Sequence, residues 1–480
     1  MRKLLGGLFI MLAFSVGSQI SFYKSYTGSP FDEGQGITQL PDSSYAITGS
    51  SAAFYYASSQ AYLMLIDSLG NHLWTKSYGG DGSDWGRRVF HIPGQGFMIA
   101  GYTNSTADGS FDAYLIKTDE NGSLVWEKNF GTSDWERIWD ATLLSDGGVI
   151  VVGESEGDLS DMKDMYIART DGYGDTVWTR KISTPYDDVA YTVAQMNDTT
   201  ILVGGDSFEN GEPRGTIISM HINGNINWQN YYGDTVETGL RDLVFYNNKI
   251  YGGGYVVQMG NTDRDFWLLK ADDSGIFENQ NTTHYNGDDI LNAIAIPEDD
   301  KLYIGLISDS PDLNVYGGGY DMFVLRFHTF MYFNGMSQGY SGYDPDIIHE
   351  MISTNDNAVA FVATVSDDRQ VASYGSDVVV VKIGPNDEVT TTVDDGNDLV
   401  AISEQSVDKT FHIFPNPAST HIFIPEGLHG EKFEIYGSEG KRVESGILSS
   451  KLVLNDLSQG FYTLRVLKEN AVINLRFVKK

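Results

Sequence analysis

The sequence predicts an all-β protein, because short apolar runs, abundant turn residues and a long internal repeat occur together. The chain has 480 residues, of which 41% are hydrophobic and 12% aromatic, and it contains 53 glycines. Most apolar runs are short and rich in Val, Ile, Tyr and Phe, as strands are. The stretch "DAYLIKTDENGSLVWEKNFG" at 112–131 recurs 52 residues later as "DMYIARTDGYGDTVWTRKIS" at 164–183. Repetition at this period is typical of folds assembled from one repeated unit.

Four kinds of strand recur, and we name them A to D from the inferred hub of the fold outward. The seven B strands end in a small residue, namely Gly49, Gly101, Gly153, Gly204, Gly254, Gly305 and Ala363. The D strands carry an aromatic residue, namely Phe22, Trp74, Trp126, Trp178, Trp228, Phe277 and Phe333. Seven copies of four short strands predict a seven-bladed β-propeller over residues 19–385.

The order of the strands predicts how the ring closes. The chain begins the repeats with a D strand at 22–26 and leaves them after a C strand at 378–383. We therefore expect the first strand to complete the last blade, which removes an exposed sheet edge.

The lengths of the loops predict a binding face. The A–B and C–D connections are tight turns such as "PGQG" and "DENGS", whereas the B–C and D–A connections are long and emerge together on the other face. Tyrosines in or near these long loops are candidates for stacking on sugar rings or contacting a protein, although a share of them is expected to pack between blades. The candidates are Tyr55, Tyr56, Tyr316, Tyr320, Tyr340 and Tyr343.

An acidic residue precedes each A strand, 17 residues before the small B-strand residue. These acids are Asp32, Asp84, Glu136, Asp187, Glu237, Asp288 and Asp346. One interpretation is a ring of carboxylates that collects Ca²⁺ or a basic partner. We favour the other, in which each carboxylate accepts backbone N–H bonds in a turn, because a catalytic site normally breaks the symmetry that these acids preserve. No other cofactor and no dedicated metal site is expected.

Other catalytic patterns are absent from the sequence. The 9 histidines, including His91 and His349 on predicted A strands, show no metal-ligand spacing. No nucleophile elbow or phosphate-binding loop occurs. The repeated turn acids Asp67, Asp119, Asp171 and Asp272 are explained by turn geometry.

The ring resembles kelch-like and quinoprotein-like propellers, in which a strand ending in glycine is followed by a strand that turns into a Trp-bearing outer strand. The segment 119–122 with Trp126 is similar to the Trp-docking segment of pyrroloquinoline quinone repeats. Those folds generally have eight blades, and Trp at one position in several blades mainly interlocks neighbours, so we expect no quinone.

The N-terminus and the charge indicate where the protein works. Residues 1–18 read as a secretory signal peptide, with a basic start, an apolar run at 4–16 too short to anchor in a bilayer, and small residues at 16–18. No later segment is expected to cross a membrane. The formal net charge of −33 argues against nucleic acid and anionic membranes as partners. Cysteine is absent, so burial and ring closure must stabilise the exported chain without disulfides.

The chain changes character after the repeats. Residues 386–410 form a polar, acidic linker, and residues 411–480 contain short strands with 9 Lys and Arg against 7 Asp and Glu, which suggests a small Ig-like β-sandwich. Its motifs are "FPNPAS" (with Pro415, Asn416 and Pro417), "LSQGFYTLRV" (with Gly460 and Tyr462) and a basic terminus, "RFVKK".

This module resembles the C-terminal sorting domain of the type IX secretion system of Bacteroidota. The resemblance implies the type IX secretion machinery as a partner, export through the periplasm to the cell surface or the medium, and removal of the module on arrival.

Three functions are compatible with these features. The favoured one is a non-enzymatic module that binds a glycan or a protein through its long-loop face. The alternatives are an extracellular glycoside hydrolase or lyase with paired carboxylates near the hub, and a purely structural surface or matrix protein.

Overall fold

The chain folds into two compact units, Met1–Ser403 and Glu404–Lys480. The computed structural model describes residues 21–26, 31–52, 58–105, 110–156, 162–233, 236–298, 301–311, 319–340, 346–366, 376–387, 420–424, 428–437, 442–454, 457–468 and 471–480. Within these residues no helix is long and apolar enough to cross a membrane.

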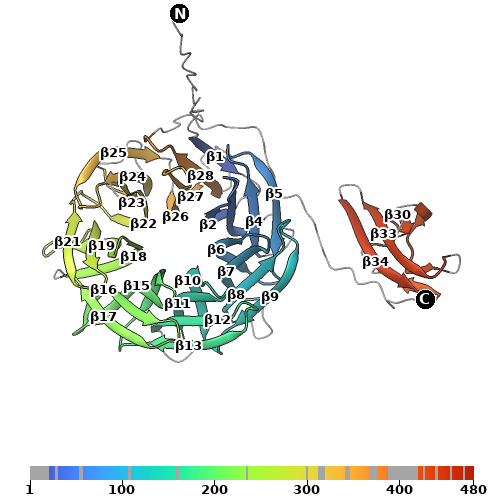
Figure 1. Cartoon of the computed structure of the whole chain (residues 1–480), viewed down its shortest axis with the longest axis horizontal. Helices are drawn as coiled ribbons and strands as arrows, with labels where there is room; N and C mark the ends of the chain where they lie inside the picture. Colours follow the sequence, from blue (N-terminus) through green and yellow to red (C-terminus); the bar gives the residue numbers. More distant parts are fainter. Residues whose placement is uncertain are drawn as a thin grey trace, which may run out of the picture. The chain divides into compact units, whose positions relative to one another are not determined.

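The described part of the first unit contains seven antiparallel four-stranded sheets arranged as the blades of a ring (Figure 1). Blade 1 comprises β2 (Asp32–Gln39), β3 (Tyr45–Ser51), β4 (Gln60–Ile66) and β5 (His72–Tyr78); blade 2 comprises β6 (Asp84–Ile92), β7 (Gly96–Thr103), β8 (Asp112–Thr118) and β9 (Leu124–Phe130). Blade 3 comprises β10 (Trp135–Leu143), β11 (Val149–Glu156), β12 (Lys163–Thr170) and β13 (Thr176–Ile182); blade 4 comprises β14 (Val189–Asn197), β15 (Thr200–Glu209), β16 (Glu212–His221) and β17 (Ile226–Tyr232). Blade 5 comprises β18 (Glu237–Tyr246), β19 (Lys249–Val257), β20 (Asp265–Asp272) and β21 (Phe277–Thr282); blade 6 comprises β22 (Asp289–Glu298), β23 (Lys301–Ser308), β24 (Asp321–Phe327) and β25 (Phe333–Tyr340).

Blade 7 combines the two ends of the repeat region. It consists of β26 (Ile347–Ser353), β27 (Val359–Ser366), β28 (Ser376–Ile383) and, as its outer strand, β1 (Phe22–Tyr26). The register runs from Phe22 opposite Lys382 to Tyr26 opposite Val378. The predicted closure by the first strand is therefore confirmed, as is the all-β propeller fold.

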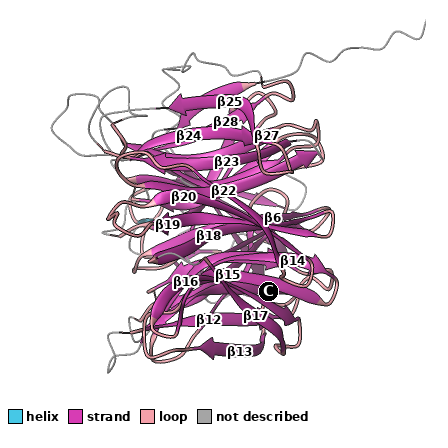
Figure 2. Ribbon diagram, turned by 90° about the vertical axis from the view of Figure 1, so that its left-hand side faces the viewer, coloured by secondary structure: helices cyan, strands magenta, loops and turns pink. Residues whose placement is uncertain are grey.

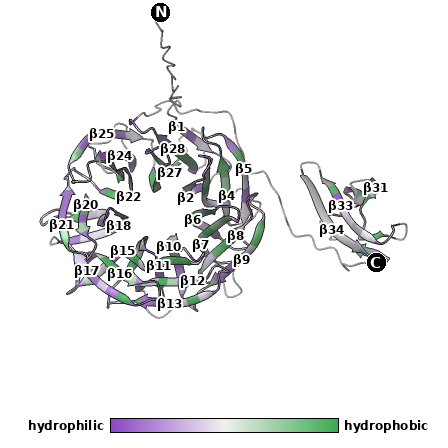
Figure 3. Ribbon diagram, viewed as in Figure 1, coloured by the Kyte–Doolittle hydropathy of each residue, from purple (hydrophilic) through white to green (hydrophobic). Residues whose placement is uncertain are grey.

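Burial follows the order of strands in each blade. The B and C strands are almost wholly buried, whereas the outer strand β21 is almost wholly exposed. Figure 3 shows the corresponding gradient, with hydrophobic residues toward the inner strands and hydrophilic residues on outer strands such as β21 and β25. The strands cross the ring from one face to the other (Figure 2), so all loops gather on its two faces.

Each innermost strand carries a bulge, and this explains the small B-strand residues of blades 1, 2, 3, 5 and 7, whereas Gly204 and Gly305 lie one residue away from it. The register shifts between Gly34 and Gly36 in β2, and the backbone there approaches Gly49 so closely that an added Cβ would lie 1.8 Å from the Glu33 carbonyl oxygen. Gly101 and Gly153 meet the bulges of β6 and β10 in the same way. Glycine permits this close approach because it has no Cβ, although Leu306 and Ala363 face the bulges of blades 6 and 7.

Neighbouring blades interlock through their outer strands. The Tyr78 hydroxyl donates to the Gly122 carbonyl of the next blade at 2.7 Å, and Tyr26 and Tyr232 make the equivalent bond. Trp74 packs on the same turn, where a Cβ on Gly122 would meet the indole at 2.8 Å. The repeated tryptophans thus serve the fold, as the sequence indicated.

The second unit contains two small sheets around one core. A two-stranded sheet pairs β29 (His421–Phe423) with β32 (Lys451–Val453), and a four-stranded sheet has the order β31 (Arg442–Ile447), β30 (Lys432–Gly437), β33 (Gly460–Lys468), β34 (Ala471–Lys479). Ile422, Ile435, Leu454, Leu464 and Val466 are among its buried residues.

Candidate ligand-binding face

The bulges place seven residues at the same position on the innermost strands. They are Gln35, Arg87, Trp139, Tyr191, Arg241, Asn292 and His349. Each lies two to four residues after the start of its A strand. This position is near the face of the ring from which the long B–C and D–A loops emerge. Blades 2 to 5 supply only arginines and aromatic residues here, so the ring loses its symmetry at this level.

Arg87 connects blades 1, 2 and 3. Its guanidinium lies 4.5 Å from the ring centroid of Trp139 and 5.5 Å from that of Tyr102, within the range of cation–π attraction. Its Nη1 donates to Oε1 of Gln35 at 2.5 Å. The planar guanidinium is therefore held between two rings and one amide.

A second arginine extends this contact toward the rim. The Arg137 guanidinium lies 5.1 Å from the Phe111 ring and 5.2 Å from the Trp135 ring. Phe111 also contacts Tyr102, which stacks on Trp85 at 4.8 Å. Trp135 is 41% exposed and presents an indole surface to solvent.

A third arginine continues the line into blades 4 and 5. The Arg241 guanidinium lies 4.1 Å from the Tyr191 ring, which is 6.1 Å from Trp139, and 5.1 Å from the Tyr255 ring. Arg264 covers the same Tyr255 ring at 4.7 Å. An unbroken series of contacts thus crosses four blades. We call it the arginine–aromatic arc, comprising Trp85, Arg87, Tyr102, Phe111, Trp135, Arg137, Trp139, Tyr191, Arg241, Tyr255 and Arg264.

Carboxylates accompany most arginines of the arc. Arg241 Nη1 donates to both carboxylate oxygens of Asp206 at 2.9 Å, and burial raises the pKa of that carboxyl while Arg241 lowers it. Arg137 lies 3.4 Å from Glu154, whose other oxygen accepts from the Trp139 indole at 3.3 Å. Burial also raises the pKa of Tyr191 to about 12, so its hydroxyl stays protonated.

Next to the arc, buried or half-buried charges join the innermost strands of different blades. Arg88 donates to Asp140 at 2.5 Å and to Glu350 at 2.9 Å. The same carboxylates accept backbone N–H bonds from the next blade, Asp140 from Val193 and Glu350 from Ile37, both at 2.7 Å. Burial raises the pKa of Glu350 to about 7 despite Arg88. Asp242 makes the equivalent bond to Ile294, and its pKa is also about 7.

The structure places the repeated acids at the ends of the B strands. Asp84 is buried and accepts bonds from the Thr103 hydroxyl and, at 3.0 Å, from the backbone N–H of Gly80. Asp32 and Glu136 contact Ser51 and Ser155 in the same way, and Asp346 accepts from the Ser366 N–H at 3.2 Å. These contacts favour a role in the turns.

In blades 4, 5 and 6 the residue that follows the predicted acid occupies the buried position that Asp84 occupies in blade 2. Asp188, Thr238 and Asp289 occupy it. The predicted residues lie next to it. Asp187 and Asp288, on the loops, accept the N–H of Lys163 and Arg264, each at 2.9 Å, and Glu237, the first residue of β18, accepts from Tyr255 at 2.7 Å. The shift arises because Gly205 meets the bulge in blade 4 and Leu306 pairs there in blade 6.

The loop tyrosines divide into two groups. Tyr320 donates to Asp288 at 3.4 Å, and Tyr340 stacks on Tyr23 of blade 7 at 5.6 Å, which is a contact between blades. Tyr55, Tyr56, Tyr316 and Tyr343 lie outside the described residues, as do Pro415, Asn416 and Pro417 of the sorting motif. In the second unit Tyr462 is buried and donates to the Ser458 carbonyl at 2.9 Å, and Gly460 begins β33.

No group of three or more His, Asp or Glu side chains among the described residues is arranged to hold a metal ion.

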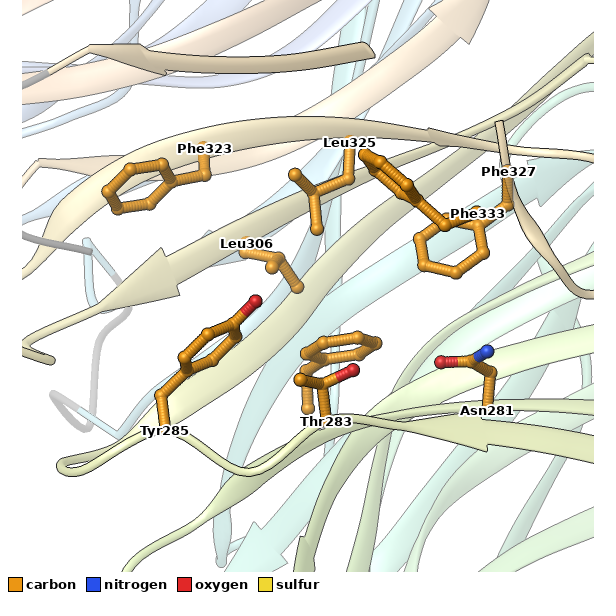
Figure 4. Close-up of a pocket in the computed structure, with 9 residues that line it drawn as sticks. Asn281, Thr283, Tyr285, Leu306, Phe323, Leu325, Phe327 and Phe333 are labelled. Carbon is orange, nitrogen blue, oxygen red and sulfur yellow. The ribbon is translucent and has the colours of Figure 1, made fainter. Parts of the chain in front are cut away.

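An apolar cavity lies apart from the arc, between the outer strands of blades 5 and 6 (Figure 4). Its volume is about 300 Å³, and Phe266, Leu306, Phe323, Leu325, Phe327 and Phe333 line it with Asn281, Thr283 and Tyr285. Asn279 occupies the tryptophan position of β21, opposite Lys270. Phe277, the aromatic residue expected in this strand, instead pairs with Ala271.

The sequence analysis selected the loop tyrosines and did not identify the residues of the arc, although one position of the repeat points to them. Arg87, Trp139, Tyr191 and Arg241 occupy equivalent positions in their repeats, three or four residues after the repeated acid of each copy. This position changes from Gln to Arg, Trp and Tyr while its neighbours repeat, which marks it as a candidate for a role other than the scaffold.

The fold and the C-terminal motifs together define an exported β-propeller protein. Residues 412–480 match the family described as "Secretion system C-terminal sorting domain". This domain directs proteins through the type IX system, so the protein is secreted or displayed at the outer-membrane surface after passage through the periplasm.

Comparisons of the whole chain add similarity of fold. The propeller domain of the trilobed protease from Pyrococcus furiosus is 10% identical, with a TM-score of 0.44, and the alignment covers 76% of this chain and 100% of that one. Sqt1 from Chaetomium thermophilum is 13% identical (TM-score 0.42, 76% and 99% covered), and a PL25 ulvan lyase is 10% identical (TM-score 0.45, 73% and 94% covered). Regulatory protein FlaEY of Caulobacter vibrioides is 28% identical over 112 residues, which span 21% of this chain and 12% of that relative.

Proposed function

We propose that this exported propeller is a non-enzymatic binding module that holds a glycan on the arginine–aromatic arc. The observation that carries the proposal is the unbroken series of rings and guanidiniums across blades 2 to 5. The proposal keeps the expected domain organisation, with a signal peptide at 1–18, the propeller at 19–385, a linker at 386–410 and the sorting domain at 411–480.

The chemistry of the arc suits sugars. Indole and phenol rings pack against the apolar C–H faces of pyranose rings, and guanidinium groups offer several N–H donors in a fixed plane. Trp135 is exposed, and Trp85, Phe111, Trp139 and Tyr191 are half-buried, so ring surface remains for a ligand. The contacts run from blade 2 to blade 5, so an extended sugar chain has several rings to contact.

The carboxylates next to the arc support binding rather than hydrolysis. Asp140 and Glu350 are committed to Arg88 and to backbone N–H groups of the next blade. A general acid and base must be free to exchange protons with a substrate. These side chains instead hold the innermost strands together.

The test compares two exposed aromatic residues on opposite faces of the full-length protein. Trp135→Ala removes an indole from the arc, whereas Tyr173→Ala removes a ring that is 76% exposed on a C–D turn. With a panel of neutral and acidic polysaccharides, we expect Trp135→Ala to weaken binding about tenfold and Tyr173→Ala to leave it unchanged. Equal binding by both variants would contradict the proposal, and release of new sugar ends during incubation would show a hydrolase or lyase instead.

A further inference from the structure

We infer that the ligand is an acidic polysaccharide and that Arg87 receives its anionic group, a uronate carboxylate or a sulfate ester. This inference rests on the proposed glycan-binding function and specifies its ligand class and its anchoring residue.

The ion pairs of neighbouring arginines set Arg87 apart. Arg88, Arg137, Arg241 and Arg264 each have a carboxylate at 2.5, 3.4, 2.9 and 3.8 Å. Among the described residues no carboxylate lies within ion-pairing distance of Arg87. The side chains that accept hydrogen bonds from it there are neutral: the Gln35 amide and the Tyr102 hydroxyl.

Arg87 also keeps an unused donor. Its Nε is buried and makes no hydrogen bond in the described structure. An unsatisfied buried donor on a charged group costs free energy, which the stacking on Trp139 and Tyr102 only partly offsets. An oxyanion that pairs with the Nη donors of this guanidinium compensates its charge, and such charge-assisted bonds are the strong ones.

The surroundings of Arg87 favour a sugar acid over an acidic peptide. The Trp139 ring lies against the guanidinium, and the Tyr191 ring lies 6.1 Å from the Trp139 ring. Aromatic rings therefore adjoin the proposed anion site. A pyranose that stacks on these rings carries its carboxylate or sulfate at its edge, within reach of Arg87. A carboxylate on a flexible aliphatic side chain would leave the rings uncovered.

The net charge of −33 gives the interaction an unusual dependence on salt. Most polyanion-binding proteins are basic and lose affinity as salt rises. Here the long-range field repels the ligand, and screening at physiological ionic strength, with a Debye length of about 8 Å, reduces that repulsion more than the direct contact with Arg87. Affinity should therefore hold or rise between low and physiological salt.

The experiment uses the full-length protein and matched ligands. Polygalacturonate is compared with its methyl ester, and dextran sulfate with dextran, so that each pair shares its sugar backbone and differs in charge. Arg87→Gln is compared with Arg180→Gln, which removes the same charge from the outer strand β13, where Arg180 donates to the Gly224 carbonyl. Thermal melts verify that the variants are folded.

We expect binding to at least one acidic member of a pair, weaker by about tenfold to a hundredfold in Arg87→Gln and unchanged in Arg180→Gln. The member that binds identifies the anion as carboxylate or sulfate. Arg87→Lys keeps the charge and loses the planar fork, so its affinity for the acidic polysaccharide should lie between those of the wild type and Arg87→Gln. If Arg87→Gln does not fold, Arg87→Lys is compared with the wild type in its place.

Other outcomes overturn the inference in distinguishable ways. Binding to dextran or the methyl ester that is unchanged in Arg87→Gln would contradict the inference of an acidic ligand and would leave the proposed glycan binding intact. Binding to poly-glutamate with no binding to any polysaccharide would contradict both the inference and the proposed glycan binding, and it would indicate a protein ligand. Acidic-polysaccharide binding that is equal in Arg87→Gln and the wild type removes Arg87 as the anchor.

Discussion

At the scale of single residues, the same side-chain types serve two purposes in this ring. Asp84 ends a D–A loop and closes it onto the Thr103 hydroxyl and the Gly80 N–H. Arg87, three residues later, has no such internal carboxylate partner among the described residues. Structural groups here are those whose polar atoms are satisfied within the blade, and candidate binding groups are those whose donors are left over.

Replacement of Asp84 tests the structural role of the repeated acids. Asp84→Ala should lower the free energy of unfolding by about 1–3 kcal/mol, because buried donors lose their acceptor. Asp81→Ala, at an exposed position in the same loop, should change it little. Urea unfolding with and without calcium measures both; a melting temperature that calcium raises in the wild type and not in Asp84→Ala would make the acids a cation site.

Replacement of Glu350 tests the buried charges by their response to pH. Its pKa in the folded state, about 7, lies above the ordinary value of 4.5, so between these values the folded state holds more protons than the unfolded state. The contribution of Glu350 to stability is thus complete below about pH 4.5 and is lost as the pH rises to 7, by on the order of 3 kcal/mol. Glu350→Gln should flatten the decline in unfolding free energy between pH 5 and pH 8. An unchanged slope would mean that Arg88 keeps Glu350 ionised throughout.

At the scale of strands and turns, the junction of blades 5 and 6 departs from the repeat in a coordinated way. Elsewhere a tryptophan of one blade packs on a turn glycine of the next, as Trp126 does on Gly174. Here Asn279 stands at the tryptophan position, and Met331, with φ of 72°, takes the place of the turn glycine. Met331 is buried among the aromatic residues of this junction. The two changes compensate, because the methionine fills space that an indole fills elsewhere.

A double-mutant cycle tests this compensation. Met331→Gly alone should destabilise the protein by about 1–3 kcal/mol through an empty volume, and Asn279→Trp alone should do so by steric conflict with Met331. The double variant restores the usual Trp–Gly pair, so its unfolding free energy should return to within about 1 kcal/mol of the wild type. Additive losses in the double variant would show that the two positions do not interact.

At the scale of the whole molecule, the proposed binding site and the sorting domain lie in different units. The propeller carries the arc, and the second unit carries the sorting domain matched at 412–480. The acidity belongs to the first unit and the linker, since residues 411–480 have 9 Lys and Arg against 7 Asp and Glu.

Removal of residues 411–480 tests the division between binding and delivery. In a host with a type IX system the truncated protein should accumulate in the periplasm, because the signal peptide remains and the sorting signal is lost. Cell fractionation followed by immunodetection measures its distribution. A truncated protein that still reaches the medium in normal amounts would place the sorting information elsewhere in the chain.

The sequence by itself determined the repeat, the closure of the ring and the export route. Those features depend on local patterns: small residues where two backbones meet at Gly49 and Gly101, aromatic residues on outer strands, and contiguous C-terminal motifs. Each copy of a repeat reports the same local constraint, so the pattern is visible without a structure.

The tertiary structure decided which residues face each other across blades. In blade 4 Gly205, rather than Gly204, meets the bulge, so counting back from Gly204 selected Asp187, whereas the buried side chain is Asp188. Arg87 meets Trp139, and Arg88 meets Glu350, only because neighbouring blades and the closed ring bring distant segments together. Contacts between blades depend on the position of each strand around the ring, and that position is a property of the assembled sheets rather than of any local stretch of sequence.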